Sequence, residues 1–125
     1  MAAARELMVQ IANEPGALAT ISDLLSAEGV NIMGFGVWVA TAHLLVTDSD
    51  AAVRILRAEG FQVEVADVLQ VVMPDEPGSL SEIAHALGDA SINIDYAYTV
   101  STNVPGAASF VLAVADTDQA EQILD

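Results

Sequence analysis

Asn13-Glu14-Pro15-Gly16-Ala17-Leu18 decides the fold, because the chain contains this stretch twice. It returns as Asp75-Glu76-Pro77-Gly78-Ser79-Leu80, so that Pro15 and Pro77 lie 62 residues apart. Proline is tolerated in the first turn of a helix, and acidic or amide side chains just before it can accept hydrogen bonds from that turn. Each copy therefore predicts a strand, a tight turn and a helix with an exposed N-terminus, which favours a bound anion.

A single copy of this turn has a second interpretation, since it is also good chemistry for starting a helix without any ligand. The whole supersecondary unit is repeated, however, and repetition at one fixed spacing favours a shared function.

The first half of the chain predicts the order strand, helix, strand, strand, helix, strand. The elements are strand Glu6–Ala12, helix Pro15–Glu28, strand Val30–Val39, strand His43–Thr47, helix Ala51–Glu59 and strand Phe61–Val65. The second half repeats the order with strand 69–73, helix 78–90, a strand that begins at Ile92, a hairpin six residues longer, and helix Thr117–Asp125. We therefore expect two units, 1–66 and 67–125, the second without its last strand. This order is that of the ferredoxin-like α+β fold, with two helices on one face of an antiparallel sheet.

The composition excludes several classes of function. Eighteen acidic residues stand against three arginines and no lysine, and the formal net charge is −15. Such a chain has no basic surface for nucleic acid or anionic lipid. It contains no cysteine, so disulfides, zinc-thiolate sites and cysteine nucleophiles are absent.

The sequence predicts neither a signal peptide nor a membrane span. The first residues contain no apolar segment of the kind that signal peptides need. Residues 29–47 carry no charge, but their asparagine, glycines, threonine and histidine favour a β-hairpin over a membrane helix. We expect a soluble protein of the cytoplasm.

Other candidate chemistry is sparse. His43 and His85 are the two histidines, and a surface or edge position is the expected one for both. The pairs Asp48/Asp50 and Asp116/Asp118 resemble metal ligands, but each pair precedes a predicted helix, where capping explains it. No nucleophile elbow, P-loop or dinucleotide fingerprint is present. We therefore expect no catalytic residue, no metal and no cofactor.

The strand, the Asn13-x-Pro15-Gly16-x-Leu18 turn, the helix and Gly29-Val30-Asn31-Ile32 together resemble the ACT domain. The second unit departs from this pattern at Asp75, where the first has Asn13. The resemblance covers almost the whole chain as two ACT units in tandem with no catalytic domain. It implies a small regulatory module that senses amino acids, similar to stand-alone tandem ACT proteins.

The resemblance also implies where a ligand lies, between the turn of one unit and the second strand of its neighbour. One site would join the turn Asn13–Leu18 to Asn93 and Ile94, and the other would join the turn Asp75–Leu80 to Asn31, Ile32 and Met33. The candidate ligand-binding residues are Asn13, Glu14, Pro15, Gly16, Ala17, Leu18, Asn31, Ile32, Met33, Asp75, Glu76, Pro77, Gly78, Ser79, Leu80, Asn93 and Ile94. Backbone N–H groups would hold a carboxylate, and carbonyl or asparagine oxygens an ammonium group. Alternatively, each asparagine bonds its own backbone at the start of a strand.

Two functions follow. The first is a free amino-acid sensor, acting as a homodimer or through a partner. The second is a regulatory subunit of a separate amino-acid biosynthetic enzyme such as acetolactate synthase. A small acyl-phosphate enzyme on this fold would need an arginine in its anion-binding loop, and Arg5, Arg54 and Arg57 all lie outside the two turns. We therefore do not expect an enzyme.

Overall fold

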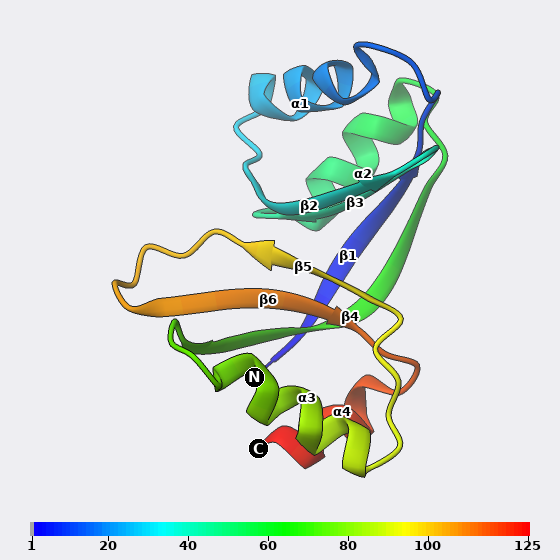
Figure 1. Ribbon diagram of the computed structural model, residues 1–125. Coiled ribbons are helices and arrows are strands. Elements are labelled where there is room, and N and C mark those ends of the chain that lie inside the picture. The colour runs from blue at the N-terminus through cyan, green and yellow to red at the C-terminus, as the bar shows by residue number, and fades with distance from the viewer. Residues whose placement is uncertain (1) are drawn as a thin grey trace. The chain divides into compact units, whose positions relative to one another are not determined.

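The structure is a computed structural model that describes residues 2–125, and its chain forms two compact units (Figure 1). One unit is Arg5–Ala66. The other is Asp67–Asp125 together with the N-terminal residues up to Ala4.

The unit Arg5–Ala66 has the element order βαββαβ. Its elements are β1 (Ala2–Gln10), α1 (Ala17–Ala27), β2 (Ile32–Trp38), β3 (Thr41–Val46), α2 (Ser49–Ala58) and the start of β4 (Val63–Pro74). Strand β3 pairs antiparallel with both β1 and β2, and the Gln10 N–H donates to the Gln62 carbonyl at 3.0 Å just before β4. Both helices cover one face of this sheet (Figure 1). The core between them contains Leu7, Ile21, Leu25, Leu44 and Leu56, all fully buried.

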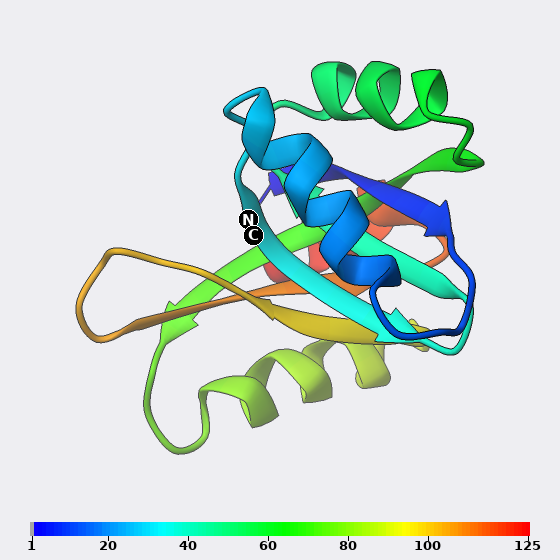
Figure 2. The same ribbon diagram turned by 90° about the horizontal axis from the view of Figure 1, so that it is seen from above.

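The unit Asp67–Asp125 repeats the pattern with β4, α3 (Ser79–Asp89), β5 (Tyr96–Val100), β6 (Ala107–Ala113) and α4 (Thr117–Leu124). Strand β6 pairs antiparallel with β4 and β5. Its core is formed by Leu69, Val71, Leu87, Leu112 and Ala120. The hairpin between β5 and β6 carries the longer loop that the sequence predicts, and this loop extends at the end of the two strands (Figure 2).

Strand β4 corrects the prediction of two separate strands, Phe61–Val65 and 69–73. The backbone runs extended without a break from Val63 to Pro74. The Ala66-Asp67 junction lacks the glycine or proline that would break a strand, and β4 continues through it, although aspartate is also a common turn residue. One element therefore contributes to both units.

The second strands begin later than predicted. Strand β2 starts at Ile32, not at Val30, and β5 starts at Tyr96, not at Ile92. Asn31 exchanges bonds with Thr47: its N–H donates to Thr47 Oγ1 at 3.0 Å, and its carbonyl accepts from the Thr47 N–H at 3.0 Å. In the second unit, Asn93 Nδ2 donates to Asp95 Oδ1 at 2.9 Å. Both asparagines are thus held just ahead of their strands, Asn31 by its backbone and Asn93 by its side chain.

Residues 29–47 are the uncharged segment for which the sequence predicts a hairpin, and β2 and β3 confirm it. Within residues 2–125, the helices are all too short or too polar to span a bilayer.

Candidate functional site

The two repeated turns have the same backbone geometry. Gly16 and Gly78 are the N-caps of α1 and α3, in the left-handed conformation with φ of 90° and 92°. Glycine adopts this conformation without steric penalty, which explains why it stands at both positions. The helices begin at Ala17 and Ser79, two residues after the prolines, so the predicted start at Pro15 is wrong.

The prediction that side chains before the helix cap it is also wrong. In residues 2–125, no side chain accepts a hydrogen bond at the start of α1 or α3. A capping side chain belongs to an N-cap residue with extended backbone, and here that position is a left-handed glycine. Asn13, Glu14, Asp75 and Glu76 are all exposed instead.

Backbone hydrogen bonds hold both turns in the same way. The Glu14 N–H donates to the Ala12 carbonyl at 2.9 Å, and the Thr20 N–H to the Gly16 carbonyl at 3.0 Å. The second turn repeats these bonds from Glu76 to Pro74 at 3.0 Å and from Glu82 to Gly78 at 2.9 Å. The first N–H groups of a helix have no partner inside it, so the uncapped turns present donors to an anion.

The two turns differ in their charges. Helix α1 has no acidic residue in its first turn, whereas α3 has Glu82 there. Asp75 replaces Asn13 as well, and its N–H donates to the Gly106 carbonyl of the long loop at 2.8 Å. Extra carboxylates near a helix N-terminus compete electrostatically with a bound anion. We therefore expect the first turn to be the better anion site.

Within one unit, the predicted strand-entry residues lie far from the turn. Asn31, Ile32 and Met33 follow the C-terminal end of α1, while the turn precedes its N-terminal end. The 11 residues of α1 separate the two groups by about 16 Å. Asn93 and Ile94 stand in the same relation to α3. A single unit thus does not bring its own turn and its own strand entry together.

A polar cluster that sequence reasoning missed lies on β1, β2 and β3. Glu6 is fully buried, and its Oε1 lies 2.8 Å from His43 Nδ1. The Trp38 ring meets the His43 ring edge-on, with centroids 5.0 Å apart. Trp38 also lies directly over Gly36, where a Cβ atom would clash with the indole. The expected surface position is therefore wrong for His43, whose side chain is 12% exposed, whereas His85 is exposed.

The aspartate pairs are helix caps. Asp48 Oδ1 accepts from the Ala51 N–H at 3.1 Å, and Asp116 Oδ1 from the Gln119 N–H at 3.0 Å. Both bonds confirm the capping interpretation. In the part of the chain that the structure describes, no group of three or more potential ligands could hold a metal ion.

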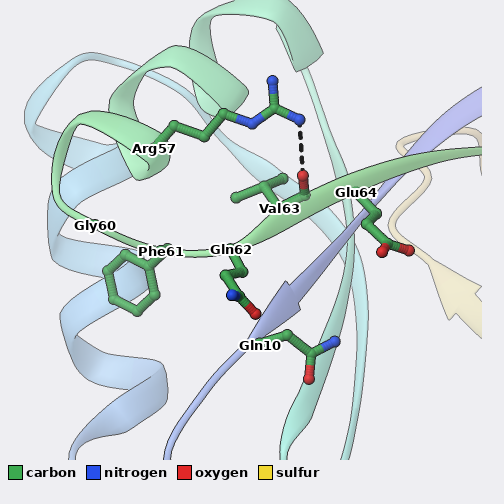
Figure 3. Close-up of a pocket in the computed structure, with 7 residues that line it drawn as sticks. All are labelled: Gln10, Arg57, Gly60, Phe61, Gln62, Val63 and Glu64. Carbon is green, nitrogen blue, oxygen red and sulfur yellow. Dashed lines mark hydrogen bonds between the residues drawn. The ribbon is translucent and has the colours of Figure 1, made fainter.

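A pocket of about 720 Å³ is a further feature without a sequence signal (Figure 3). It lies in the unit Arg5–Ala66, where α2 ends and β4 begins. Its walls are formed by Gln10, Arg57, Gly60, Phe61, Gln62, Val63 and Glu64. Six of these residues lie within residues 57–64, and Gln10 joins them from the end of β1.

Strand β2 and the turn after it carry an exposed apolar surface. Phe35 is 54% exposed and Val37 39%, and the turn residue Val39 reaches 73%. We call Phe35, Val37 and Val39 the β2 strip. Contiguous exposed apolar side chains of this kind mark contact surfaces more often than isolated ones do.

Residues 68–125 match the family model of the ACT domain. No curated protein sequence matches the chain. Protein BT0572 of Bacteroides thetaiotaomicron has a similar structure, with a TM-score of 0.86 and 24% identity over 98% of this chain and 86% of that one. The regulatory subunit of aspartate kinase from Thermus thermophilus is similar with a TM-score of 0.67 and 17% identity, over 99% and 95%. At these identities the solved structures establish a shared fold. The family match thus covers residues 68–125, and the solved structures extend the likeness of fold to the whole chain.

Proposed function

We propose that this protein is a regulatory module of two ferredoxin-like ACT units, 1–66 and 67–125, which senses a free α-amino acid and catalyses no reaction. The observation that carries the proposal is the repeated, uncapped turn with glycine φ of 90° and 92°. Two helix N-termini built alike, in a chain with three cationic side chains, suit a ligand carboxylate held by backbone N–H groups. We expect it to act in the cytoplasm.

The proposed sites lie between neighbouring units. The turn Asn13–Leu18 would hold the carboxylate, and Asn93 and Ile94 of a neighbouring unit would accept from the ammonium group. The turn Asp75–Leu80 would pair with Asn31, Ile32 and Met33 in the same manner. Because Asp75 and Glu82 add negative charge, the second site would bind the carboxylate more weakly.

A second candidate function is a regulatory subunit of a separate biosynthetic enzyme. The β2 strip favours it, since an exposed apolar surface suits either a second copy of the chain or a partner enzyme. Acetolactate synthase is one candidate partner. Aspartate kinase is another, because one solved structure with this fold is a regulatory subunit of that enzyme.

The experiment is a thermal-shift screen of the free amino acids, followed by calorimetric titration of the best ligand into three variants. Ala19→Asp places a carboxylate in the first turn of α1, where it suits the helix dipole but repels a bound carboxylate. We expect affinity to fall about tenfold, since a like charge at about 4 Å costs about 1 kcal/mol or more. Ala19→Asn is the uncharged control.

Ser81→Asp makes the same change at the matching position of the second turn. We expect it to affect affinity less than Ala19→Asp does. Unchanged affinity in both aspartate variants would exclude the turns as the site, and a screen without any ligand would favour the partner-subunit function.

A further inference from the structure

The pocket at the start of β4 has a polar lining that no proposed role explains. Figure 3 shows Arg57 at the end of α2, Gln62 just before β4, Glu64 at the start of β4, and Gln10 at the end of β1 beside Gln62. The Gln10 N–H donates to the Gln62 carbonyl at 3.0 Å, which fixes these two segments side by side. Gln62 and Glu64 are two residues apart on extended backbone, so their side chains lie on one face.

Arg57 retains donors for a ligand. Its Nη2 donates to the Val63 carbonyl at 2.8 Å, which uses one of the five N–H groups of the guanidinium. Arg5, by contrast, forms an ion pair with Asp50 at 3.0 Å. Within residues 2–125, Arg57 forms no ion pair, although the chain carries 18 acidic residues. A cation that lines the pocket therefore remains available to an anionic group.

The pocket also contains polar groups that suit a ligand with both a carboxylate and an ammonium group. The Gln10 Oε1 accepts from Thr41 Oγ1 at 3.4 Å, which leaves the Gln10 Nε2 as a donor, and Gln10 lines the pocket. Glu64 supplies the carboxylate in the pocket wall, and its side chain is exposed. The pocket thus offers a guanidinium and amides to a carboxylate, and a carboxylate to an ammonium group.

We propose that this pocket is a second binding site, for a small zwitterion whose carboxylate contacts Arg57 and whose ammonium group contacts Glu64. A simple anion fits less well, because a chain of net charge −15 repels it, whereas a zwitterion carries no net charge. The inference rests on the proposed function for the class of ligand, an amino acid, and differs from it in the site. The pocket lies within one unit, and the strand-entry residues are not among those that line it.

Arg57 could also have a purely structural role, because its hydrogen bond to the Val63 carbonyl covers an edge of β4. Arg57→Gln and Arg54→Gln separate the two roles. Both change the net charge by the same amount on the same exposed face of α2, and Arg54 does not line the pocket. Glu64→Gln is a second variant that leaves the Arg57 bond to Val63 in place.

The measurement is a nuclear magnetic resonance titration with glycine, with acetate and methylammonium as the two halves of the zwitterion. We expect glycine to shift the side-chain amide signals of Gln10 and Gln62 saturably. Arg57→Gln should weaken this response about tenfold or more, and Arg54→Gln should leave it unchanged. Glu64→Gln should weaken the binding of glycine but not the binding of acetate.

Three outcomes would overturn the proposal. One is an equal glycine response in wild type and Arg57→Gln, and another is acetate binding as well as glycine does. The third is a response confined to the backbone N–H signals of Leu18 and Ala19, which would retain the proposed function and reject this pocket. Shifts confined to Gln10 and Gln62 would instead retain the pocket and reject the turns.

Discussion

His43 Nδ1 lies 2.8 Å from Oε1 of Glu6, a carboxylate with no solvent exposure. The two side chains come from the paired strands β1 and β3, where Met8 faces His43 in the register. Trp38 on β2 adds a ring contact to His43. Burial of a carboxylate is costly unless it is paired, so the histidine stabilises Glu6 in the fold.

We predict that His43→Ala destabilises the protein by about 3 kcal/mol, because it leaves the Glu6 carboxylate buried without this partner. Urea unfolding followed by circular dichroism measures the change. His85→Ala on exposed α3 is the matched control, with an expected effect within about 0.5 kcal/mol. Equal stability of the two variants would show that Glu6 does not depend on His43.

Substitution by alanine should lower the stability of the protein at a turn glycine and raise it at a glycine inside a helix. Gly16→Ala places a Cβ atom at φ of +90°, a conformation that costs about 1–3 kcal/mol for other residues. Gly88→Ala lies inside α3 with nothing within 4 Å of the new atom, and should stabilise the protein by about 0.5–1 kcal/mol. Thermal melts of both variants measure the difference. A stabilised Gly16→Ala would contradict the left-handed turn.

The β2 strip should control association. Phe35→Asp places a charge at the centre of this strip. We expect the dissociation constant for the association of two copies of the chain to rise at least tenfold, so that more of the protein is monomeric. Sedimentation equilibrium measures this, and Val104→Asp, at a similarly exposed apolar residue in the long loop, is the control. If wild type is already monomeric at high concentration, the strip serves a different partner, and co-purification should then depend on Phe35.

Much of the element order could be predicted because the chain repeats itself. Two turn motifs 62 residues apart, each followed by helical spacing of apolar residues, located α1 and α3 to within a few residues. Aspartates before α2 and α4 identified their caps correctly, because capping depends on local chemistry. The continuity of β4 could not be predicted, since Val65 and Val68 belong equally well to one strand or two.

The candidate site was harder to predict. The exposed turns could be predicted from the Pro-Gly pattern. The N-cap is a left-handed glycine, however, so the expected side-chain cap does not form, and this φ angle could not be read from the sequence. Glu6 and His43 are 37 residues apart, and only the β1–β3 register brings them into contact. Arg57 likewise becomes a candidate binding residue only because the fold brings the end of α2 to the same pocket as Gln10 and Gln62.

The shared strand β4 also limits where this chain could be divided. Residues up to Ala4 belong with Asp67–Asp125, while the rest of β1 belongs with the other unit. A cut at Ala66 would therefore leave Asp67–Asp125 without residues that belong to the same unit. A fragment that carries residues 2–4 as well as Asp67–Asp125 would keep those residues with their own unit.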